Sequence, residues 1–131
     1  MTLRLVSAGP RVAILAEDLI WATRLSEIVR RAGGEPVRLA SAALLRAALP
    51  TLDGCVVDLT ARSYDGIAAV TIAATARVPT VAVGQHDDVG ERRVAREAGA
   101  ARVYAYRALF EHGDRELGGW VARLRREEEN Q

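Results

Sequence analysis

Short apolar runs alternate with longer amphipathic segments along the whole chain. The clearest runs are residues 12–16, 54–58 and 79–83, which are flanked by turn-forming residues such as Gly, Pro and Asp. An apolar run of this length is typical of a strand that is buried on both faces of a parallel sheet. We interpret residues 36–40 and 102–106, which are less apolar, as two further strands. The pattern therefore predicts five strands.

Helical segments fill the intervals between these strands. Residues 19–32 carry Trp21, Leu25, Ile28 and Ala32 at the three- and four-residue spacing of a helix that covers a core. Helix-capping residues, glycine stops and a final apolar stripe predict four more helices, at residues 41–49, 67–76, 87–98 and about 117–124.

Five strands alternating with five helices predict a single α/β domain with a parallel sheet and right-handed crossovers. We place an N-terminal extension at residues 1–10, the domain at residues 11–126 and a charged, frayed tail at residues 127–131. Gly113 and Gly118 lower the helix propensity of the last segment, so its start is left open.

The charge balance argues against nucleic acid and membrane surfaces as partners, because 18 basic and 17 acidic residues leave a net charge of only +1. All the basic residues are Arg, so no mechanism that needs a side-chain ammonium group is available. The single Cys55 predicts a buried small side chain and no disulfide within the chain. His86 and His112 have no partner at metal-ligand spacing. Without a secretory signal or an apolar span, we expect a cytoplasmic protein.

Carboxylates follow two of the predicted strands. Glu17 and Asp18 come directly after the first strand, and Asp58 ends the third. Sites in open parallel sheets lie beyond the carboxyl ends of the strands, so neighbouring strands would bring these three side chains to one edge. Three carboxylates in one pocket repel one another unless a cation lies among them.

The order of several short motifs resembles the receiver domain of bacterial response regulators, the CheY-like family. The resemblance covers residues 11 to about 125 and implies a flavodoxin-like, doubly wound fold with strand order 2-1-3-4-5. The motifs that carry it are Ala-Ile-Leu-Ala-Glu-Asp at residues 13–18, Asp58-Leu59 followed by Asp65-Gly66, Val78-Pro79-Thr80-Val81, and Glu97-Ala98-Gly99-Ala100.

This resemblance implies roles for the acidic residues. Asp58 would be the phosphoacceptor for a histidine kinase. Glu17, Asp18 and Asp58 would hold Mg²⁺ together with the backbone carbonyl of Thr60. Carboxylate and carbonyl oxygens are suitable Mg²⁺ ligands, and the ion would neutralise a phosphoryl group in transfer.

Two positions depart from the family pattern. Gly84 stands where members carry a Ser or Thr at the end of the fourth strand, so the switch hydroxyl is absent. Tyr106 stands at the position of the family's Lys. Arg62 and Arg107 are the nearby cations that could reach the acidic pocket, although strand alternation would point Arg107 to the other face.

These departures favour an atypical stand-alone receiver, a pseudo-receiver, which signals through protein–protein contact and is not an enzyme. Its partner would be a histidine kinase or an output protein. By resemblance, the partner or homodimer surface would lie on the fourth helix, fifth strand and fifth helix. The candidate residues there are Arg92, Arg93, Arg96, Arg102 and Tyr104.

Two alternatives remain open from the sequence. The first is a working phosphotransfer receiver that is phosphorylated on Asp58 by a histidine kinase with Mg²⁺. The second is a domain that binds a small ligand in the space left above Gly84.

Overall fold

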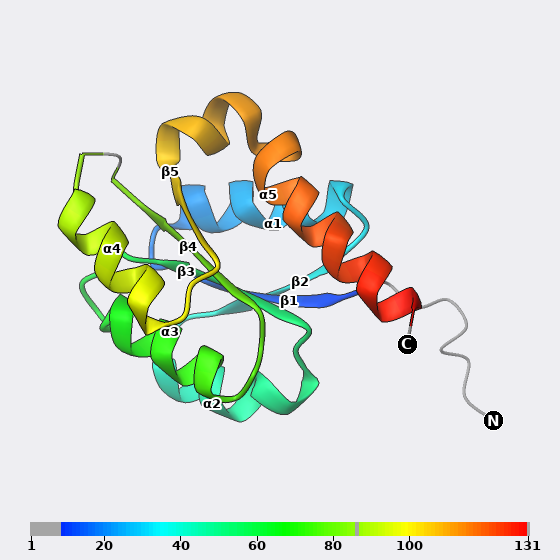
Figure 1. Cartoon of the computed structure of the whole chain (residues 1–131), viewed down its shortest axis with the longest axis horizontal. Coiled ribbons are helices and arrows are strands. Elements are labelled where there is room, and N and C mark those ends of the chain that lie inside the picture. The colour runs from blue at the N-terminus through cyan, green and yellow to red at the C-terminus, as the bar shows by residue number, and fades with distance from the viewer. Residues whose placement is uncertain (1–8, 86, 131) are drawn as a thin grey trace.

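The protein is a five-stranded parallel sheet with helices on both faces, and the computed structural model describes residues 9–85 and 87–130 (Figure 1). The strand order is β2-β1-β3-β4-β5, which confirms the predicted topology. The elements in chain order are β1 (Arg11–Leu15), α1 (Leu19–Arg31), β2 (Glu35–Leu39), α2 (Ala42–Ala48), β3 (Gly54–Asp58), α3 (Gly66–Thr75), β4 (Thr80–Gly84), α4 (Val89–Ala98), β5 (Arg102–Ala105) and α5 (Tyr106–Glu129).

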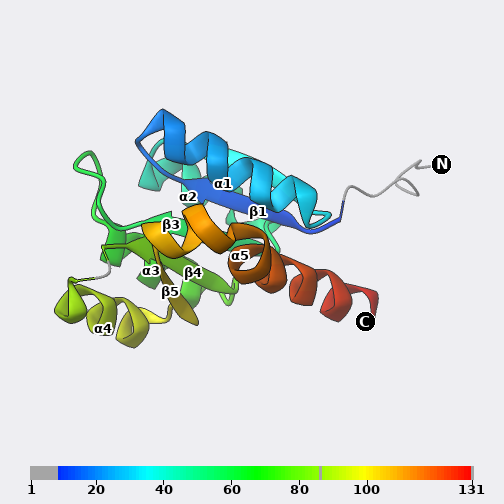
Figure 2. The same ribbon diagram turned by 90° about the horizontal axis from the view of Figure 1, so that it is seen from above.

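The sheet separates two apolar layers because side chains alternate between its faces. On β1, Val12 and Ile14 face α1 and α5, whereas Ala13 and Leu15 face α2, α3 and α4. α1 and α5 lie side by side over the first face (Figures 1 and 2). All four of these strand residues are fully buried, as expected for a central parallel strand.

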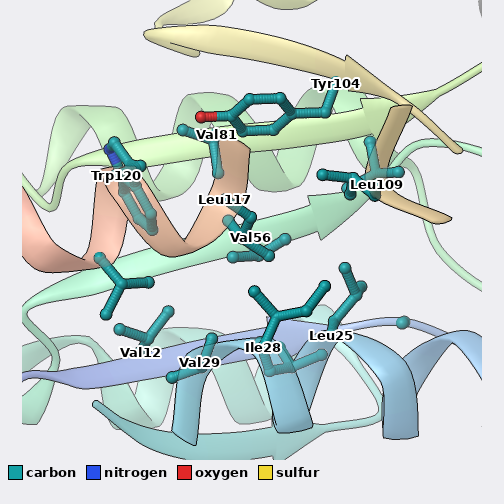
Figure 3. Close-up of a cluster of buried hydrophobic side chains, with 14 of the residues drawn as sticks. Val12, Leu25, Ile28, Val29, Val56, Val81, Tyr104, Leu109, Leu117 and Trp120 are labelled. Carbon is teal, nitrogen blue, oxygen red and sulfur yellow. The ribbon is translucent and has the colours of Figure 1, made fainter. Parts of the chain in front are cut away.

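The layer under α1 and α5 contains the buried rings of Tyr104 and Trp120. Figure 3 shows Leu25, Ile28 and Val29 of α1 facing strand residues, with Leu117 and Trp120 of α5 closing the cluster. Burial of such side chains stabilises the fold by roughly 1.5–3 kcal/mol for each one. The predicted apolar stripe on the last helix is therefore confirmed as core.

Short polar side chains begin the helices that surround the site. Asp18 accepts a hydrogen bond from the backbone N–H of Trp21, and Asp65 accepts one from Ala68. Asp88 does the same for Glu91 at the start of α4. These caps fix the residue at which each helix begins.

The last helix differs most from the sequence prediction. Tyr106, which was expected to end the fifth strand, is instead the first residue of α5. The helix is kinked at His112, whose φ of −138° and ψ of 34° are not helical. It continues to Glu129, so residues 127–129 of the expected frayed tail are helical. The expected N-terminal extension falls mainly on residues 1–8, outside the described residues.

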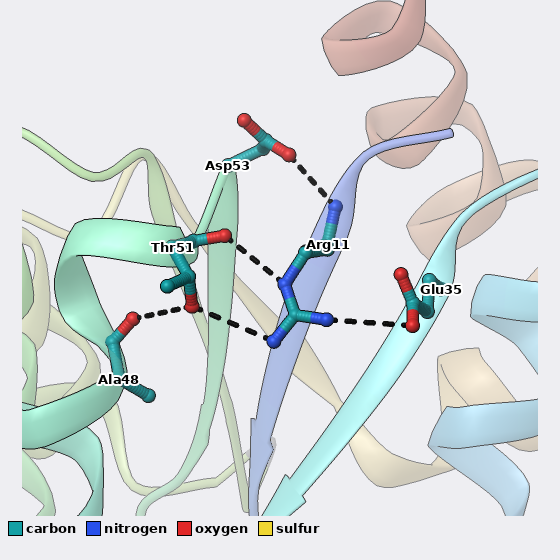
Figure 4. A network of polar contacts seen from close by, with 5 residues as sticks. All are labelled: Arg11, Glu35, Ala48, Thr51 and Asp53. Carbon is teal, nitrogen blue, oxygen red and sulfur yellow. Dashed lines mark hydrogen bonds and ion pairs between the residues drawn. The ribbon is translucent and has the colours of Figure 1, made fainter. Parts of the chain in front are cut away.

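A polar network holds the opposite, amino-terminal edge of the sheet (Figure 4). The guanidinium of Arg11 donates to the carbonyl of Thr51 and forms an ion pair with Glu35 on β2 at 3.4 Å. Its backbone N–H donates to Asp53, just before β3. The network therefore joins β1, β2 and the approach to β3, and leaves the carboxyl-terminal edge for the site.

No helix among the described residues is long and apolar enough to cross a membrane.

Candidate functional site

The carboxyl ends of β1, β3 and β4 meet at one edge of the sheet. Leu15 pairs with Val57, and Asp58 pairs with Val83, so Asp58 lies between the ends of its two neighbouring strands. Gly84 follows as the last residue of β4. The predicted convergence of acidic residues on this edge is therefore correct at the level of the backbone.

Asp58 is a buried carboxylate whose side-chain hydrogen bonds all involve one oxygen. Only 2% of Asp58 is exposed to solvent. Oδ1 accepts from the backbone N–H of Thr60 at 2.9 Å, from the Thr60 hydroxyl at 2.8 Å and from the Tyr106 hydroxyl. Oδ2 has no hydrogen-bond partner among the described residues. Every fully buried side-chain nitrogen or oxygen of those residues has a partner, so Oδ2 must keep some contact with solvent.

Tyr106 reaches Asp58 from the start of α5. Its hydroxyl also lies 2.7 Å from the hydroxyl of Thr60. Its ring packs against Trp21 with centroids 4.7 Å apart. Desolvation raises the pKa of the Tyr106 phenol, and its hydrogen bond with Asp58 adds to this effect. The phenol therefore stays protonated at neutral pH and donates to the carboxylate at the position where the resemblance places a lysine.

Tyr64 ties together the strands that carry the acidic residues. Its hydroxyl lies 2.9 Å from the carbonyl oxygen of Leu15 and 2.8 Å from that of Asp58, and donates to both. Burial raises the pKa of Tyr64, and the negative charge of Asp58 raises it further. This contact bridges the ends of β1 and β3 beneath the site.

Glu17 is directed to the loop between β3 and α3. Its carboxylate accepts hydrogen bonds from the backbone N–H groups of Arg62 at 3.1 Å and Ser63 at 3.0 Å. Hydrogen bonding by Ser63, followed by that of the Arg62 backbone, lowers the pKa of Glu17. Glu17 therefore anchors a loop and leaves only Asp18 and Asp58 at the hollow described below.

The three acidic side chains do not form a ready metal site. Oδ1 of Asp18 caps α1, Glu17 holds the loop, and Asp58 is bonded to Thr60 and Tyr106. Within residues 9–85 and 87–130, no group of three or more His, Cys, Asp or Glu side chains is arranged to hold a metal ion. The carboxylates as placed do not fit the octahedral Mg²⁺ coordination that the resemblance implies.

The glycine at the end of β4 has room for a Cβ atom. A methyl group built on Gly84 would lie 3.4 Å from Leu59 and 3.5 Å from the carboxylate of Glu91, which are ordinary contact distances. Burial raises the pKa of Glu91, and the negative charges of Asp88 and Asp58 raise it further. A carboxylate therefore approaches the position where the resemblance expects a phosphate-binding hydroxyl.

A hollow of about 340 Å³ opens above the buried carboxylate. We call it the Asp58 hollow. No cation lines it. Its walls come from β3, the loops after β1, β3 and β4, and the first turns of α1 and α5. The lining residues are Asp18, Trp21, Asp58, Thr60, Gln85 and Tyr106.

Neither candidate arginine fills the Asp58 hollow. Arg107 is exposed and pairs with Glu111 one turn along α5 at 2.8 Å. Arg62 is exposed and contacts Glu17 through its backbone N–H. Arg24 stacks on a ring that lines the hollow without entering it. Its guanidinium lies 4.7 Å from the ring centre of Phe110 and 5.8 Å from that of Trp21.

His112 contributes nothing to the described site. His112 is exposed at the kink of α5. His86 lies outside the described residues.

Arginines gather on the expected partner surface. Arg92, Arg96 and Arg102 line a second hollow of about 330 Å³ between α4, β5 and α5, with Glu116 as its acidic residue. Arg92 also donates to the carbonyl of Val103 at 3.1 Å, which holds α4 against β5. The expected residue Arg93 is exposed on α4.

Tyr104 needs a correction as a contact residue of that surface. It is only 6% exposed, and its ring belongs to the core under α1 and α5 (Figure 3). Its hydroxyl lies 3.3 Å from the carbonyl oxygen of Glu116 and donates to it. Strand alternation explains the burial, because Val103 and Tyr104 pack on opposite faces of β5.

Three residues of the site were missed by sequence reasoning. Trp21 was assigned to the core stripe, whereas its ring is half-buried and lines the Asp58 hollow. Glu91 carries no sequence signal of its own. Tyr64 offers a single hint, because a large aromatic residue in the loop after residues 54–58 needs a buried surface.

Comparison with known proteins supports the fold. No protein-family model and no curated protein matches the chain. Among solved structures, a receiver domain of a Francisella response regulator superposes with a TM-score of 0.73 at 16% identity, over 91% of this chain and 98% of that one. A CheY-like receiver domain protein from Methanospirillum hungatei gives a TM-score of 0.71 at 16% identity, over 91% and 98% of the two chains.

A third similar structure holds a metal ion. It is the receiver domain of a sensor histidine kinase from Pseudomonas aeruginosa, with magnesium coordinated in its active-site cleft. Its TM-score is 0.71 at 18% identity, over 86% of this chain and 98% of that one. These likenesses, together with the strand order, show that the chain has the CheY-like fold of response regulator receiver domains.

Proposed function

We propose that this protein is a pseudo-receiver that signals through protein–protein contact, with Asp58 unphosphorylated and without catalytic turnover of its own. One observation carries the proposal. The hydroxyls of Tyr106 and Thr60 both bond Oδ1 of Asp58, in the place where a phosphotransfer site needs a cation. A neutral phenol donates one hydrogen bond but supplies no charge to a phosphoryl group in transfer.

The charges around Asp58 also oppose phosphorylation. An aspartyl phosphate carries about 1.5 to 2 negative charges at neutral pH, against the single charge of the carboxylate that it replaces. The Asp58 hollow already carries Asp18, the described part of its lining contains no cation, and Glu91 approaches from α4. Glu17, which would contribute to a Mg²⁺ site, is bonded to the backbone of the loop. An added phosphoryl group would therefore meet carboxylates without a counter-charge.

The surface on α4, β5 and α5 is the proposed contact for a signalling partner or a second copy. Three arginines and one glutamate line its 330 Å³ hollow, so the surface favours an acidic partner segment. The arginine side chains present planar donors that suit carboxylates. This location follows the resemblance, and the charge of the lining residues supports it.

The test uses a phosphodonor and intact mass. The full chain is incubated with Mg²⁺ and acetyl phosphate or phosphoramidate beside a receiver domain of known competence as positive control. We expect no phosphoryl adduct on this protein. An adduct that disappears in Asp58→Asn would overturn the proposal and favour the alternative.

That alternative is a phosphotransfer receiver that uses a histidine kinase and Mg²⁺. One observation favours it, because Oδ2 of Asp58 has no hydrogen-bond partner among the described residues and so remains open to attack on a phosphodonor. A beryllofluoride titration followed by NMR distinguishes the two. Shifts centred on Asp58 and Thr60 would support the alternative, and an unchanged spectrum would support the pseudo-receiver.

A further inference from the structure

We infer that the Asp58 hollow binds a primary alkylammonium group in place of a phosphoryl group or a metal ion. The inference deepens the proposed function, and rests on it only in that Asp58 stays an unmodified carboxylate. The ammonium would come either from a free amine or from a lysine side chain of a partner protein.

The first step is the uncompensated charge. Asp58 is 2% exposed, yet its bonding partners are a backbone N–H and two neutral hydroxyls. A second carboxylate, Asp18, lines the same hollow, and none of the described residues that line it is cationic. A buried carboxylate without a cation is unfavourable, so a cation that enters the hollow would be stabilised.

The second step is the choice between a metal and an organic cation. Mg²⁺ needs several oxygen ligands in near-octahedral geometry, and the described residues contain no group of three acidic, His or Cys side chains that could supply them. The hollow measures about 340 Å³, which exceeds the room that a single ion requires. Two of its walls are the aromatic rings of Trp21 and Tyr106. Aromatic rings suit an alkyl stem and an organic cation, and do not coordinate Mg²⁺.

The third step is the choice of head group. A guanidinium binds best when its fork meets both oxygens of one carboxylate. Oδ1 of Asp58 already accepts three hydrogen bonds, so this residue offers only Oδ2. Asp18 likewise uses Oδ1 for the N–H of Trp21. An ammonium group has three donors that can each take a separate acceptor, which matches single oxygens on Asp58 and Asp18 and the side-chain amide of Gln85.

The chain cannot fill the Asp58 hollow with such a group from a side chain of its own, because it contains no lysine. The nearest stacked guanidinium, on Arg24, lies against Phe110 and Trp21 and does not line the hollow. None of the described residues supplies a cation to the hollow, so the cation comes from another molecule.

The test is an NMR titration of the unphosphorylated full chain with n-butylammonium chloride at constant ionic strength. The two tryptophans give an internal reference, because Trp21 lines the hollow and Trp120 lies in the core. We expect the indole N–H signal of Trp21 to shift in a saturable way and that of Trp120 to stay in place. Butanol matches the alkyl stem without the charge and should give no saturable shift.

Charge-removing variants supply the control. Asp18→Asn keeps a helix cap and removes one carboxylate, and we expect the affinity to fall about tenfold. Asp58→Asn should lower it at least as much, because that charge is the more buried of the two. Asp65→Asn makes the same change at the cap of α3, away from the hollow, and should leave the affinity unchanged.

Further arms separate the sources of the cation and the competing ligands. Butylguanidinium should bind more weakly than butylammonium. A capped peptide with one lysine should bind more tightly than the free amine if the natural source is a protein, and a norleucine peptide should not bind. Equal binding of butanol, or an amine affinity that Asp18→Asn and Asp58→Asn leave unchanged, would overturn the inference.

Shifts of the same signals by MgCl₂ at lower concentration than the amine would also overturn it in favour of a metal site. No phosphodonor is present in the titration, so a failure here leaves the acetyl phosphate result, and hence the proposed function, intact.

Discussion

The hydroxyl of Tyr106 donates a hydrogen bond to the buried carboxylate of Asp58, and thereby joins the first residue of α5 to the last residue of β3. The same tyrosine packs its ring against Trp21 on α1, at a centroid distance of 4.7 Å. Three elements far apart in the sequence are therefore held together over the acidic edge. The arrangement gives the carboxylate a structural role as an acceptor.

Removing this hydroxyl should destabilise the protein. Tyr106→Phe leaves a buried carboxylate with one donor fewer, and hydrogen bonds to charged groups contribute about 1.5–3 kcal/mol to the free energy of unfolding. Tyr104→Phe is a matched control, because it loses a hydrogen bond to the neutral carbonyl of Glu116 and should cost only about 0.5–1.5 kcal/mol. Urea denaturation measures both. Equal losses of unfolding free energy would show that the hydrogen bond from Tyr106 to the carboxylate of Asp58 contributes no more than one to a neutral carbonyl.

Adding the two groups that receiver domains carry at positions 84 and 106 should permit phosphorylation. Gly84→Thr supplies a hydroxyl, and a Cβ at this position would meet only ordinary contacts, of 3.4 Å to Leu59 and 3.5 Å to Glu91. Tyr106→Lys supplies an ammonium group beside Asp58. With Mg²⁺ and acetyl phosphate, we expect the double variant to gain a phosphoryl adduct by intact mass. Adding Asp58→Asn should abolish the adduct. A double variant that stays unmodified would point to the loop-bound position of Glu17 as the obstacle.

The sequence predicted the layers and the acidic edge because these follow from the backbone. Alternating burial and the adjacency of parallel strands place Glu17, Asp18 and Asp58 at one edge whatever their rotamers. The direction of each side chain depends on its neighbours in space. Glu17 meets loop N–H groups from Arg62 and Ser63, which are 45 and 46 residues away. No local pattern encodes such a contact.

The position of Tyr106 also depends on contacts with residues distant in the sequence, which no local pattern encodes. The run of residues 102–106 is apolar enough to continue as a strand, and its last residue nevertheless begins α5. Packing on Trp21 and bonding to Asp58 both favour this placement. Strand alternation was therefore a poor guide for Arg107, which lies on the first turn of the helix and faces solvent.

Tyr64→Phe should weaken the join between β1 and β3. The hydroxyl satisfies the carbonyl oxygens of Leu15 and Asp58, and loss of a partner for such part-buried groups costs about 1–3 kcal/mol. The ring is retained, so the packing stays the same. We expect a lower urea midpoint with an unchanged slope. A midpoint within error of the wild type would show that water replaces the hydroxyl.

Acidification should release the loop between β3 and α3. The folded pKa of Glu17 is lowered by its hydrogen bonds, so its stabilising effect is fully present above the usual range of Glu. The effect is lost as the pH falls through the lowered folded value. Amide exchange at Arg62 and Ser63, corrected for the intrinsic pH dependence, should quicken in that window. Glu17→Gln should show fast exchange at every pH, and an unaltered profile would contradict the anchoring role.

Cys55 should report opening of the central sheet. Burial raises the pKa of its thiol to about 12, so the folded protein holds almost no thiolate at pH 8. Its side chain is fully buried in β3, the strand whose last residue, Asp58, accepts a hydrogen bond from Tyr64. We expect a disulfide reagent such as DTNB to label this single thiol only as fast as the protein opens, and at once in concentrated urea. Tyr64→Phe should label faster than the wild type, because it lowers the free energy of opening. Rapid labelling of the folded wild type at a rate proportional to reagent concentration would show that the thiol is exposed without unfolding.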